Sequence, residues 1–426
     1  MRQKELWIRS KIHSYNGLMK SVSVIGLGYI GLPTSILLAQ YGYKVQGFDI
    51  DEKRIAKINA GEAIFHEKQL EEKLREVLSS RQFEASGVLE QADIYIITVP
   101  TPLTSSKAPD HSHVLEAISK VSKLLKNNDF LILESTCAVG FTKEIFKNIQ
   151  IERPDLFEGE LANFYFAYCP ERVLPGNIFF ELENNSRVIG GIDPKSSNMI
   201  ADFYKTFVSG QIDRVDSSTA EMIKLIENTY RDINIAFANE VSEIAAKHNV
   251  NPYLAITIAN KHPRVNILNP GPGVGGHCIA IDPWFLIYGS EHLAKLSYLA
   301  RMQNEMRPAE VAKKVIENLE NASISPRLLL LGMTYKANSD DTRESPSAEL
   351  VKFLLNRNLD IDICDPYVSE TKIKDVNIVP FDEISTRISD YSHIVILVNH
   401  DLFHALEPLI REHKAVLDFC GYLNSR

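Results

Sequence analysis

Short apolar runs alternate with helical segments in the first half of the chain. Runs rich in Val, Ile and Phe, each only a few residues long, predict strands. They cover residues 21–25, 43–50, 93–99, 130–134 and 164–168. A helical segment at residues 32–41 follows the first run. Because strands that alternate with helices form parallel sheets, this half predicts a parallel sheet in an α/β domain ending near residue 210.

The pattern changes beyond that point. Residues 219–248 contain neither Pro nor Gly and predict one long helix, and helical segments dominate to about residue 306. Strand patterns then return at residues 328–331, 359–364, 393–398 and 416–419. Two segments here, 360–365 and 392–398, are similar to residues 44–49 and 92–99 of the first half. We therefore expect an α/β protein with two doubly wound, Rossmann-like domains joined by a helical domain.

Four segments follow from these changes in pattern. Residues 1–20 are polar and basic, and we expect them to form an N-terminal extension. The expected domains are residues 21–210, 211–310 and 311–426. A chain of 426 residues is long enough for two or three hydrophobic cores, which agrees with this division.

Composition and charge argue against several kinds of partner. The net charge is −9 and the isoelectric point is about 5.8, so we expect no general basic surface for nucleic acid. No apolar run approaches the roughly 18 residues of a membrane-spanning helix, and the N-terminus does not resemble a signal peptide. The five cysteines include no CxxC pair, which indicates a reduced, cytoplasmic setting. No residues have metal-ligand spacing, so we expect no metal site.

A glycine motif, Gly26-Leu-Gly-Tyr-Ile-Gly31, lies between the first strand and the first helix. In a dinucleotide site, the first glycine permits the turn, the second lets the pyrophosphate approach, and the third allows close helix packing. Asp49, at the end of the next strand, can accept hydrogen bonds from the ribose hydroxyls of NAD. Lys53 and Arg54 nearby leave NADP open, and a purely structural glycine turn is the alternative.

A second strand end carries prolines rather than glycines. The strand at residues 93–99 is followed by Pro100-Thr-Pro102. Ligands of doubly wound folds bind at the carboxyl ends of the strands, so this segment is a candidate for cofactor contact. The alternative is a strand that is simply stopped by proline.

One cysteine lies in an unusual loop. Residues 269–278 hold four glycines and two prolines, and the loop delivers Cys278, followed by Asp282. A cysteine is a nucleophile only as its thiolate, so a catalytic Cys278 needs surroundings that favour ionisation. The alternative is a buried, unreactive thiol. The other four cysteines lie in or beside strand-like apolar segments and are interpreted as structural, as is His277, which has no partners at metal spacing.

The long helix carries a polar stripe. Its members, at spacings of three and four, are Glu221, Lys224, Asn228 and Arg231. Such spacing places them on one face of a helix, where they could simply be solvated. Alternatively, Lys224 and Asn228, one turn apart, could together orient an alkoxide or a water molecule.

Six motifs together resemble the UDP-glucose/GDP-mannose dehydrogenase family over nearly the whole chain from residue 21. They are residues 26–31, 134–136, 169–176, 224–228, 275–283 and 341–346. The resemblance implies an N-terminal NAD domain, a helical dimerisation domain and a C-terminal UDP-sugar domain. It therefore implies NAD as cofactor, a UDP-sugar as substrate, and a homodimer.

The resemblance also implies a reaction and roles for individual residues. In it, Cys278 traps an aldehyde as a thiohemiacetal, a second NAD oxidises this to a thioester, and water hydrolyses the thioester. Lys224 and Asn228 stabilise the oxyanion, while Asp282 and Thr136 orient water and Lys224. Glu171 and Lys224 are both acid/base candidates. The implied catalytic residues are Cys278, Lys224, Asn228, Asp282, Glu171 and Thr136.

The resemblance implies binding residues in each α/β domain and in the middle domain. Those for the cofactor are Gly26, Gly28, Tyr29, Ile30, Gly31, Asp49, Arg54, Pro100, Thr101 and Thr136. Those for the substrate are Glu171, Arg172, Val173, Lys224, Asn228, Arg231, His262, Arg264, Gly275, Lys336 and Arg343. The charges of Lys336 and Arg343 suit a pyrophosphate or a uronate, although as isolated residues they would be surface charges.

Within the family, residues 262–285 and 231–240 are most similar to members that oxidise the C6 hydroxyl of UDP-N-acetyl-D-mannosamine. Oxidation of UDP-N-acetylglucosamine is the first alternative, and UDP-glucose or GDP-mannose the next. Ile281 stands where enzymes for UDP-glucose typically carry Lys, which argues against that sugar. Outside this chemistry, the alternatives are a two-electron dehydrogenase of the 6-phosphogluconate or 3-hydroxyacid kind and a non-catalytic NAD-binding sensor.

Overall fold

The computed structural model describes residues 21–424 with a few gaps. The gaps are His66, Leu174, Pro175, His277, residues 320–325, Asn358, Lys372 and Asp375. The expected extension at residues 1–20, and His277, therefore lie outside the described residues. The chain divides into two compact units between Leu225 and Ile226. Each unit is described by itself below.

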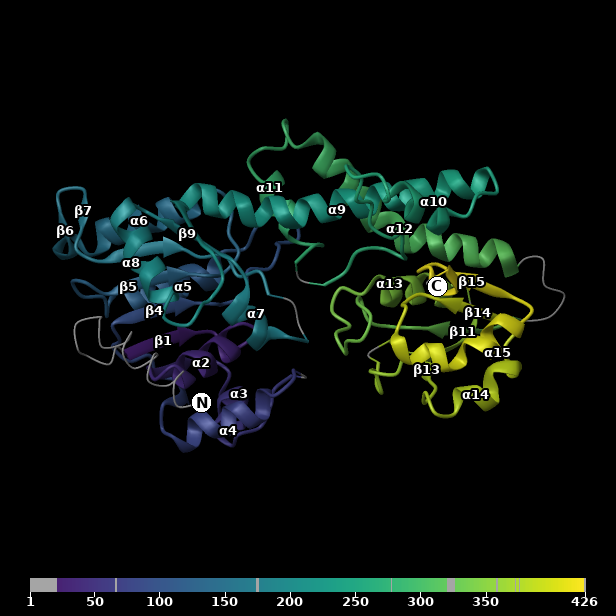
Figure 1. Ribbon diagram of the computed structural model, residues 1–426, viewed down its shortest axis with the longest axis horizontal. Helices are drawn as coiled ribbons and strands as arrows, with labels where there is room; N and C mark the ends of the chain where they lie inside the picture. The colour runs from purple at the N-terminus through teal and green to yellow at the C-terminus, as the bar shows by residue number, and fades with distance from the viewer. Residues whose placement is uncertain are drawn as a thin grey trace. The chain divides into compact units, whose positions relative to one another are not determined.

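The first unit is built on an eight-stranded sheet of described residues, in the order β10-β9-β8-β5-β4-β1-β2-β3 (Figure 1). The strands are β1 Ser21–Ile25, β2 Lys44–Phe48, β3 Phe83–Ser86, β4 Ile94–Ile97, β5 Phe130–Leu133, β8 Tyr165–Tyr168, β9 Arg187–Gly191 and β10 Ile212–Asp216. Neighbouring strands are parallel except that β8 and β9 are antiparallel. The parallel sheet expected from the sequence therefore has one antiparallel step. It also extends past residue 210, because β10 pairs with β9.

Helices cover both faces of this sheet. They are α2 Gly31–Gln40, α3 Glu52–Asn59, α4 Leu70–Ser79, α5 Ser112–Ser122, α6 Phe141–Glu152, α7 Ile178–Asn184 and α8 Pro194–Tyr204, with a short hairpin of β6 Phe157–Glu158 and β7 Leu161–Ala162. Alternate residues of a strand point to opposite faces. Val24 of β1 accordingly packs in the core under α2, whereas Ile25 packs in the core that α5 and α6 cover. The carboxyl ends of the central strands lead into the loops that carry the cofactor candidates.

The second unit begins within a long helix. Its helical part consists of α9 Ser217–Lys247, which starts in the first unit, α10 Pro252–Ala259, α11 Asp282–Ile287 and α12 Lys295–Leu319. The prediction of one long helix at residues 219–248 is confirmed. The boundary expected between residues 310 and 311 falls inside α12. The helix continues because Val311 and Val315 pack against Leu328 and Leu330 of the following sheet.

The second unit ends in a five-stranded parallel sheet of described residues, in the order β13-β12-β11-β14-β15. Its strands are β11 Arg327–Leu331, β12 Asp360–Cys364, β13 Asn377–Ile378, β14 His393–Ile396 and β15 Val416–Asp418, and its helices are α13 Pro346–Leu355, α14 Ile384–Arg387 and α15 Glu407–Glu412. This order repeats β3-β2-β1-β4-β5 of the first sheet. The expectation of two doubly wound α/β sheets is confirmed. No helix among the described residues has the length and apolar character needed to cross a membrane.

Candidate active site

The three glycines of the first turn differ in what surrounds them. Gly26 has a φ of +97°, and a Cβ at Gly31 would lie 1.8 Å from the carbonyl oxygen of Gly26. Both positions therefore require glycine for the turn itself. A Cβ at Gly28 would meet nothing within 4 Å. The backbone of Gly28 thus faces open space, which suits the close approach of a pyrophosphate.

Asp49 ties this turn to the next strand. It is buried at the end of β2, and its Oδ2 accepts from the backbone N–H of Leu27 at 2.8 Å. The same oxygen pairs with Arg54 Nη1 at 2.8 Å, and Oδ1 accepts from Asp51 N at 2.9 Å. Tyr29 projects from the turn and is stacked on Phe65, with 4.2 Å between the ring centroids. The structure therefore brings Asp49 and Arg54 together beside the glycine turn.

The remaining cofactor candidates lie at neighbouring strand ends. Pro100 and Thr101 follow β4, Thr136 follows β5, and Ile30 precedes the first residue of α2. Strands β5, β4, β1 and β2 are adjacent and parallel, so their carboxyl ends meet at one edge of the sheet. Thr98 was missed in the sequence. Its hydroxyl donates to Gly26 O at 2.8 Å and so supports the turn from β4.

Glu171, Arg172 and Val173 follow β8 on the same sheet. The carboxylate of Glu171 is held on both sides, because Oε1 accepts from the backbone amides of Arg172 and Val173 at 2.6 and 2.8 Å. Its Oε2 forms a buried ion pair with Arg187 at 2.5 Å. As an acid/base candidate, Glu171 is therefore held in place by a cation that the sequence did not single out.

A second buried carboxyl group lies beside this pair. Glu134 Oε1 is 4.0 Å from Arg187 Nη1 and accepts a hydrogen bond from the Tyr204 hydroxyl at 2.5 Å. Burial raises the pKa of Glu134 to about 7, although the positive charge of Arg187 opposes this shift. Arg187, Tyr204 and Glu134 thus form a network behind Glu171.

The polar stripe of α9 is mostly buried, which excludes its interpretation as a solvated face. Glu221 is fully buried and caps α6, because it accepts from the backbone amides of Gly140 and Thr142 at 2.6 and 2.8 Å. Lys224 Nζ donates to the main-chain oxygen of Glu171 at 2.6 Å. Asn228 is also buried, whereas Arg231 is exposed.

Asn228 connects α9 to the turn that carries Cys278. Its Nδ2 donates to Asp282 Oδ2 at 2.5 Å, and Asp282 is the first residue of α11. The backbone N–H of Asp282 donates to Cys278 O at 2.8 Å. The structure therefore brings Cys278, Asp282 and Asn228 together.

The glycines before Cys278 allow the loop to pack against the last domain. A Cβ at Gly275 would lie 2.3 Å from Glu344 O, and one at Gly276 would lie 2.7 Å from the ring of Tyr335. Gly276 N also donates to Arg343 O at 3.2 Å. Gly275 requires glycine because its backbone meets the backbone of Glu344, and Gly276 because its φ is +78° and the Tyr335 ring leaves no room for a Cβ. The contact brings Gly275 close to the segment that carries Arg343.

Cys278 differs from the other cysteines in its exposure. Cys137, Cys169 and Cys364 are buried, Cys420 is partly buried, and Cys278 is exposed. Burial raises the pKa of the Cys364 thiol to about 12 and those of Cys137, Cys169 and Cys420 well above the ordinary value. Among the five cysteines, Cys278 is therefore the one whose side chain is exposed.

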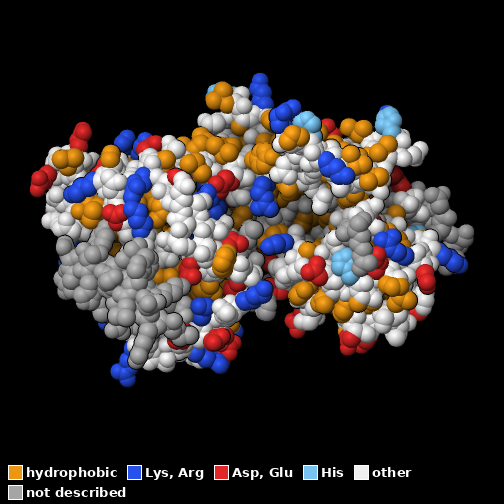
Figure 2. All heavy atoms as spheres, viewed as in Figure 1, with side chains coloured by type: hydrophobic (Ala, Val, Ile, Leu, Met, Phe, Trp, Pro, Cys, Tyr) orange, Lys and Arg blue, Asp and Glu red, His pale blue; other side chains and the backbone are white. Residues whose placement is uncertain are grey.

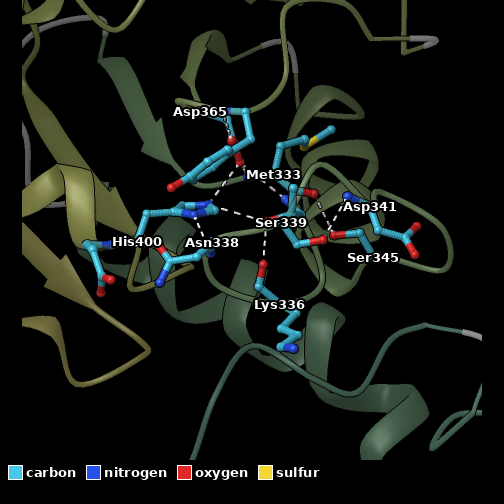
Figure 3. A network of polar contacts seen from close by, with 11 residues as sticks. Met333, Lys336, Asn338, Ser339, Asp341, Ser345, Asp365 and His400 are labelled. Carbon is cyan, nitrogen blue, oxygen red and sulfur yellow. Dashed lines mark hydrogen bonds and ion pairs between the residues drawn. The ribbon is translucent and has the colours of Figure 1, made fainter. Parts of the chain in front are cut away.

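The loop after β11 carries two exposed cations, Lys336 and Arg343. Arg343 forms a two-point pair with Asp341, at 2.8 Å to Oδ1 and 2.6 Å to Oδ2. Figure 3 shows how His400 and Asp365 hold the loop: Asn338 N donates to His400 Nδ1 at 3.0 Å, and His400 Nε2 lies 3.2 Å from Asp365 Oδ2. Burial acts to raise the pKa of Asp365, but the hydrogen bond from His400 and two backbone amides lowers it overall.

Three substrate candidates lie apart from these contacts in the second unit. Arg231 is exposed on α9, and His262 and Arg264 are exposed in the turn that follows α10. The backbone N–H of Arg264 lies 3.4 Å from His262 Nδ1. Their role in binding substrate remains a prediction from the sequence.

Comparison with known proteins assigns nearly the whole chain to one protein family. Three models of one family match in succession: the NAD binding domain at residues 20–208, the central domain at 218–306 and the UDP binding domain at 329–425. The chain belongs to the UDP-glucose/GDP-mannose dehydrogenase family. It is accordingly an NAD-dependent nucleotide-sugar dehydrogenase.

Individual relatives cover nearly all of this dehydrogenase. A UDP-N-acetyl-D-mannosamine dehydrogenase of Methanococcus maripaludis is 43% identical over 91% of this chain and 88% of its own. An NDP-N-acetyl-D-galactosaminuronic acid dehydrogenase of Ralstonia nicotianae is 38% identical over 96% of this chain and 97% of its own. The structure of a UDP-D-ManNAc dehydrogenase from Pyrococcus horikoshii superposes with a TM-score of 0.86 at 38% identity, covering 95% of this chain and 96% of that one.

Two of the candidate residues pair with side chains that were not themselves candidates in the sequence. Arg187 and Asp341 each pair with a side chain that the sequence did single out, Glu171 and Arg343. Asp341 opens one of the family motifs, so its position was a signal. Arg187 follows Glu171 by 16 residues and lies on another strand, so no local spacing indicated the pair.

Proposed function

We propose that this dehydrogenase oxidises the C6 hydroxyl of UDP-N-acetyl-D-mannosamine to a carboxylate in two steps, with Cys278 as covalent nucleophile. The observation that carries the proposal is the exposed Cys278, in a turn joined through Asp282 to Asn228. The relatives with that activity support the choice of sugar. In an NAD-dependent dehydrogenase that oxidises an alcohol, a nucleophilic thiol is needed only where the aldehyde must be held for a second oxidation.

The residues of the first turn fit NAD. Gly28 leaves its backbone open to a pyrophosphate, and the carboxylate of Asp49 would repel the 2′-phosphate of NADP. Arg54, which could have favoured that phosphate, is paired with Asp49. When bound, NAD accepts a hydride from C6 in each of the two oxidations.

Lys224 and Asn228 are proposed to hold the reacting oxygen. They lie one turn apart on α9, about 6 Å along the helix axis, so both can reach one oxygen atom. In the first oxidation, the hydroxyl proton passes to Lys224 or Glu171 as the base, and the carbon becomes an aldehyde. Because Arg187 and two amides hold the Glu171 carboxylate, we favour Lys224 for this proton.

Cys278 is proposed to act next. Its thiolate adds to the aldehyde carbon, a C–S bond forms, and Asn228 and Lys224 stabilise the oxyanion of the thiohemiacetal. Loss of a second hydride leaves a thioester. Water, oriented by Asp282 and Thr136, then adds to this carbon, the C–S bond breaks, and the sugar leaves as its carboxylate. One alcohol and one water thus consume two NAD and release three protons.

Substrate binding is proposed to involve the loop after β11. The exposed Lys336 and Arg343 suit the pyrophosphate of a UDP-sugar, and Gly275 is packed beside the segment that carries Arg343. Arg343 would then share its guanidinium between Asp341 and the ligand. Arg172, Val173, Arg231, His262 and Arg264 complete the proposed set.

We also propose a homodimer built on the helical part of the second unit. Four large apolar side chains on α9, Ile226, Tyr230, Phe237 and Ile244, are each about half exposed, and their spacings of four and seven place them on one stripe. Leu254 and Ile258 of α10 are exposed as well. Figure 2 shows hydrophobic side chains gathered over the helices of this part. A stripe of this kind is typical of an interface between helices.

We place the protein in the cytoplasm, where Cys278 would stay reduced.

The test is a spectrophotometric NADH assay with four substrates: UDP-N-acetylmannosamine, UDP-N-acetylglucosamine, UDP-glucose and GDP-mannose. The proposal predicts the highest kcat/KM with the mannosamine sugar and two NADH for each sugar consumed. A preference for UDP-N-acetylglucosamine would correct the sugar and leave the chemistry in place. One NADH per sugar, with an aldehyde released, would instead identify a two-electron dehydrogenase.

A further inference from the structure

A line of buried polar side chains runs between α9 and α12. Its members are Asp232 and Asn239 on α9, and Arg301, Asn304 and Arg307 on α12. All five are at most 2% exposed, although charged and amide side chains are uncommon in such surroundings. Asp232 and Asn239 lie on the same helix as Lys224 and Asn228, but none of the five was a candidate site residue in the sequence.

These side chains are connected to one another. Arg301 Nη1 pairs with Asp232 Oδ1 at 2.5 Å. Asn304 Nδ2 donates to the same carboxylate oxygen at 2.9 Å and to Asp232 O at 2.8 Å. Asn239 Nδ2 in turn lies 3.4 Å from Asn304 Oδ1. The two helices are therefore joined by one continuous polar chain.

This chain reaches the cysteine loop at two points. Before Cys278, the backbone of Gly271 is held on both sides: its N–H donates to Asn239 Oδ1 at 2.9 Å and its carbonyl accepts from Arg307 Nε at 3.1 Å. After Cys278, Arg301 Nη1 donates to Ile279 O at 3.3 Å. The loop that carries the nucleophile is thus attached to α9 and α12 on either side of Cys278.

The ion pair is not explained by helix packing alone. A buried ion pair loses the hydration of both charges, and apolar residues of similar volume often pack two helices at least as well. Asp232 Oδ2 and Arg301 Nε have no hydrogen-bond partner among the described residues. Burial raises the pKa of Asp232 to about 6 even though Arg301 opposes the shift. What the pair does provide, and apolar residues would not, is an N–H group directed at Ile279 O.

We propose that the Arg301–Asp232 pair is a positioning device for Cys278. Asp232 orients the guanidinium, Arg301 holds Ile279 O, and this hold fixes the tight turn in which Cys278 O accepts from Ile281 N and Asp282 N at 3.1 and 2.8 Å. Arg301 therefore acts through the turn and does not itself touch substrate. The inference rests on the proposed role of Cys278 as nucleophile.

The test uses the full chain and removes both charges together. The double variant Asp232→Asn/Arg301→Met leaves no unpaired buried charge, keeps an oxygen for Asn304, and replaces the arginine stem with a side chain of similar shape. It loses the donor to Ile279 O. The matched control is Gln303→Ala, which removes another α12-to-α9 hydrogen bond, from Gln303 Nε2 to Ala236 O at 3.3 Å, without touching the loop.

Hydrogen exchange measured by mass spectrometry reports on the turn directly. In the double variant, the amides of Ile281 and Asp282 should exchange at least tenfold faster, while peptides from the first sheet are unchanged. In steady-state kinetics, kcat should fall at least tenfold while KM for NAD stays within twofold. The control should match the parent chain in both measurements.

Unchanged exchange in the turn of the double variant would overturn the proposal, and so would unchanged kcat despite faster exchange. Faster exchange throughout α9 and α12 would also overturn it, because the pair would then serve the helices in general. Exchange of the turn does not depend on turnover. A failure of the proposed function, seen as acid formation without Cys278, is therefore distinguished from a failure of this positioning role.

Discussion

At the scale of residues, the side chains proposed to be catalytic are held by hydrogen bonds to defined partners. Lys224 donates to Glu171 O and Asn228 donates to Asp282, so each proposed catalytic group on α9 has a defined partner. Glu171 is held in turn by Arg187, whose other buried neighbour is Glu134. Two carboxyl groups thus share one cation, and burial raises the pKa of Glu134, the one farther from it.

This arrangement predicts how Glu134 affects stability. Its pKa is about 7 in the folded chain, against an ordinary value of 4.5. Between these values the unfolded chain loses the proton while the folded chain keeps it, so the free energy of unfolding falls as pH rises through this window. The variant Glu134→Gln, which cannot ionise, should therefore gain about 1–3 kcal/mol relative to the parent between pH 4.5 and pH 7.5.

Urea unfolding of both chains at these two pH values measures the gain. Gln retains an oxygen that accepts from the Tyr204 hydroxyl, so the comparison isolates the charge. If the two chains show the same dependence on pH, Glu134 is not the buried group that titrates in this window.

At the scale of elements, the glycines of the first turn differ in what a side chain would disturb. Replacing Gly31 by Ala places a Cβ 1.8 Å from Gly26 O, so this variant should be destabilised by roughly 2 kcal/mol or more. Gly28→Ala meets no atom within 4 Å and should fold as stably as the parent. Because its methyl group would occupy the space proposed for the pyrophosphate, it should weaken NAD binding at least tenfold.

Thermal unfolding and calorimetric titration with NAD separate these two effects. Gly28→Ala should keep the melting temperature and lose affinity. Unchanged NAD affinity in this variant would show that the cofactor does not approach the turn as proposed.

Elements also show what could be predicted from sequence. The central strands and α9 were predicted, because apolar runs and a long segment without Pro or Gly are local signals. Strand β10 was not predicted, since Ile212–Asp216 is polar and mostly exposed at the edge of the sheet. The extent of α12 was missed because Pro308 lies inside it, where a helix is expected to end.

The candidate site was predicted only in part for a related reason. Motifs indicated Cys278, Lys224, Asn228 and Asp282 as candidates, because these residues lie in short conspicuous segments. Motifs did not indicate the residues that hold these candidates through hydrogen bonds. Arg301 and Asp232 are 69 residues apart and lie on helices without any unusual composition, so only the folded chain shows their contact.

At the scale of the whole molecule, the two sheets repeat one strand order and one device. In each, a carboxylate at the end of the second strand holds the loop after the first: Asp49 accepts from Leu27 N at 2.8 Å, and Asp365 accepts from Met333 N at 2.7 Å. The NAD binding domain and the UDP binding domain of the family are thus built on sheets with the same strand order. What differs is the helical part of the second unit, with its exposed apolar stripe.

This stripe leads to a prediction about assembly. Phe237→Glu places a charge in the middle of the stripe, and in a dimer built on α9 the charge would lose its hydration. Light scattering after size exclusion should show a dimer for the parent chain and a monomer for the variant. Glu240→Gln, at an exposed polar position of the same helix, should stay dimeric. A Phe237→Glu chain with unchanged mass would place the interface elsewhere.

The central claim is that Cys278 allows one site to oxidise the same carbon twice. The most direct test measures NADH and uronate formed from UDP-N-acetylmannosamine by the parent chain and by Cys278→Ala. The side chain is exposed, so the variant should fold normally. The parent should form two NADH for each uronate, and the variant should form less than about 1% as much uronate in the same time. Uronate formation at an unchanged rate by Cys278→Ala would contradict the claim.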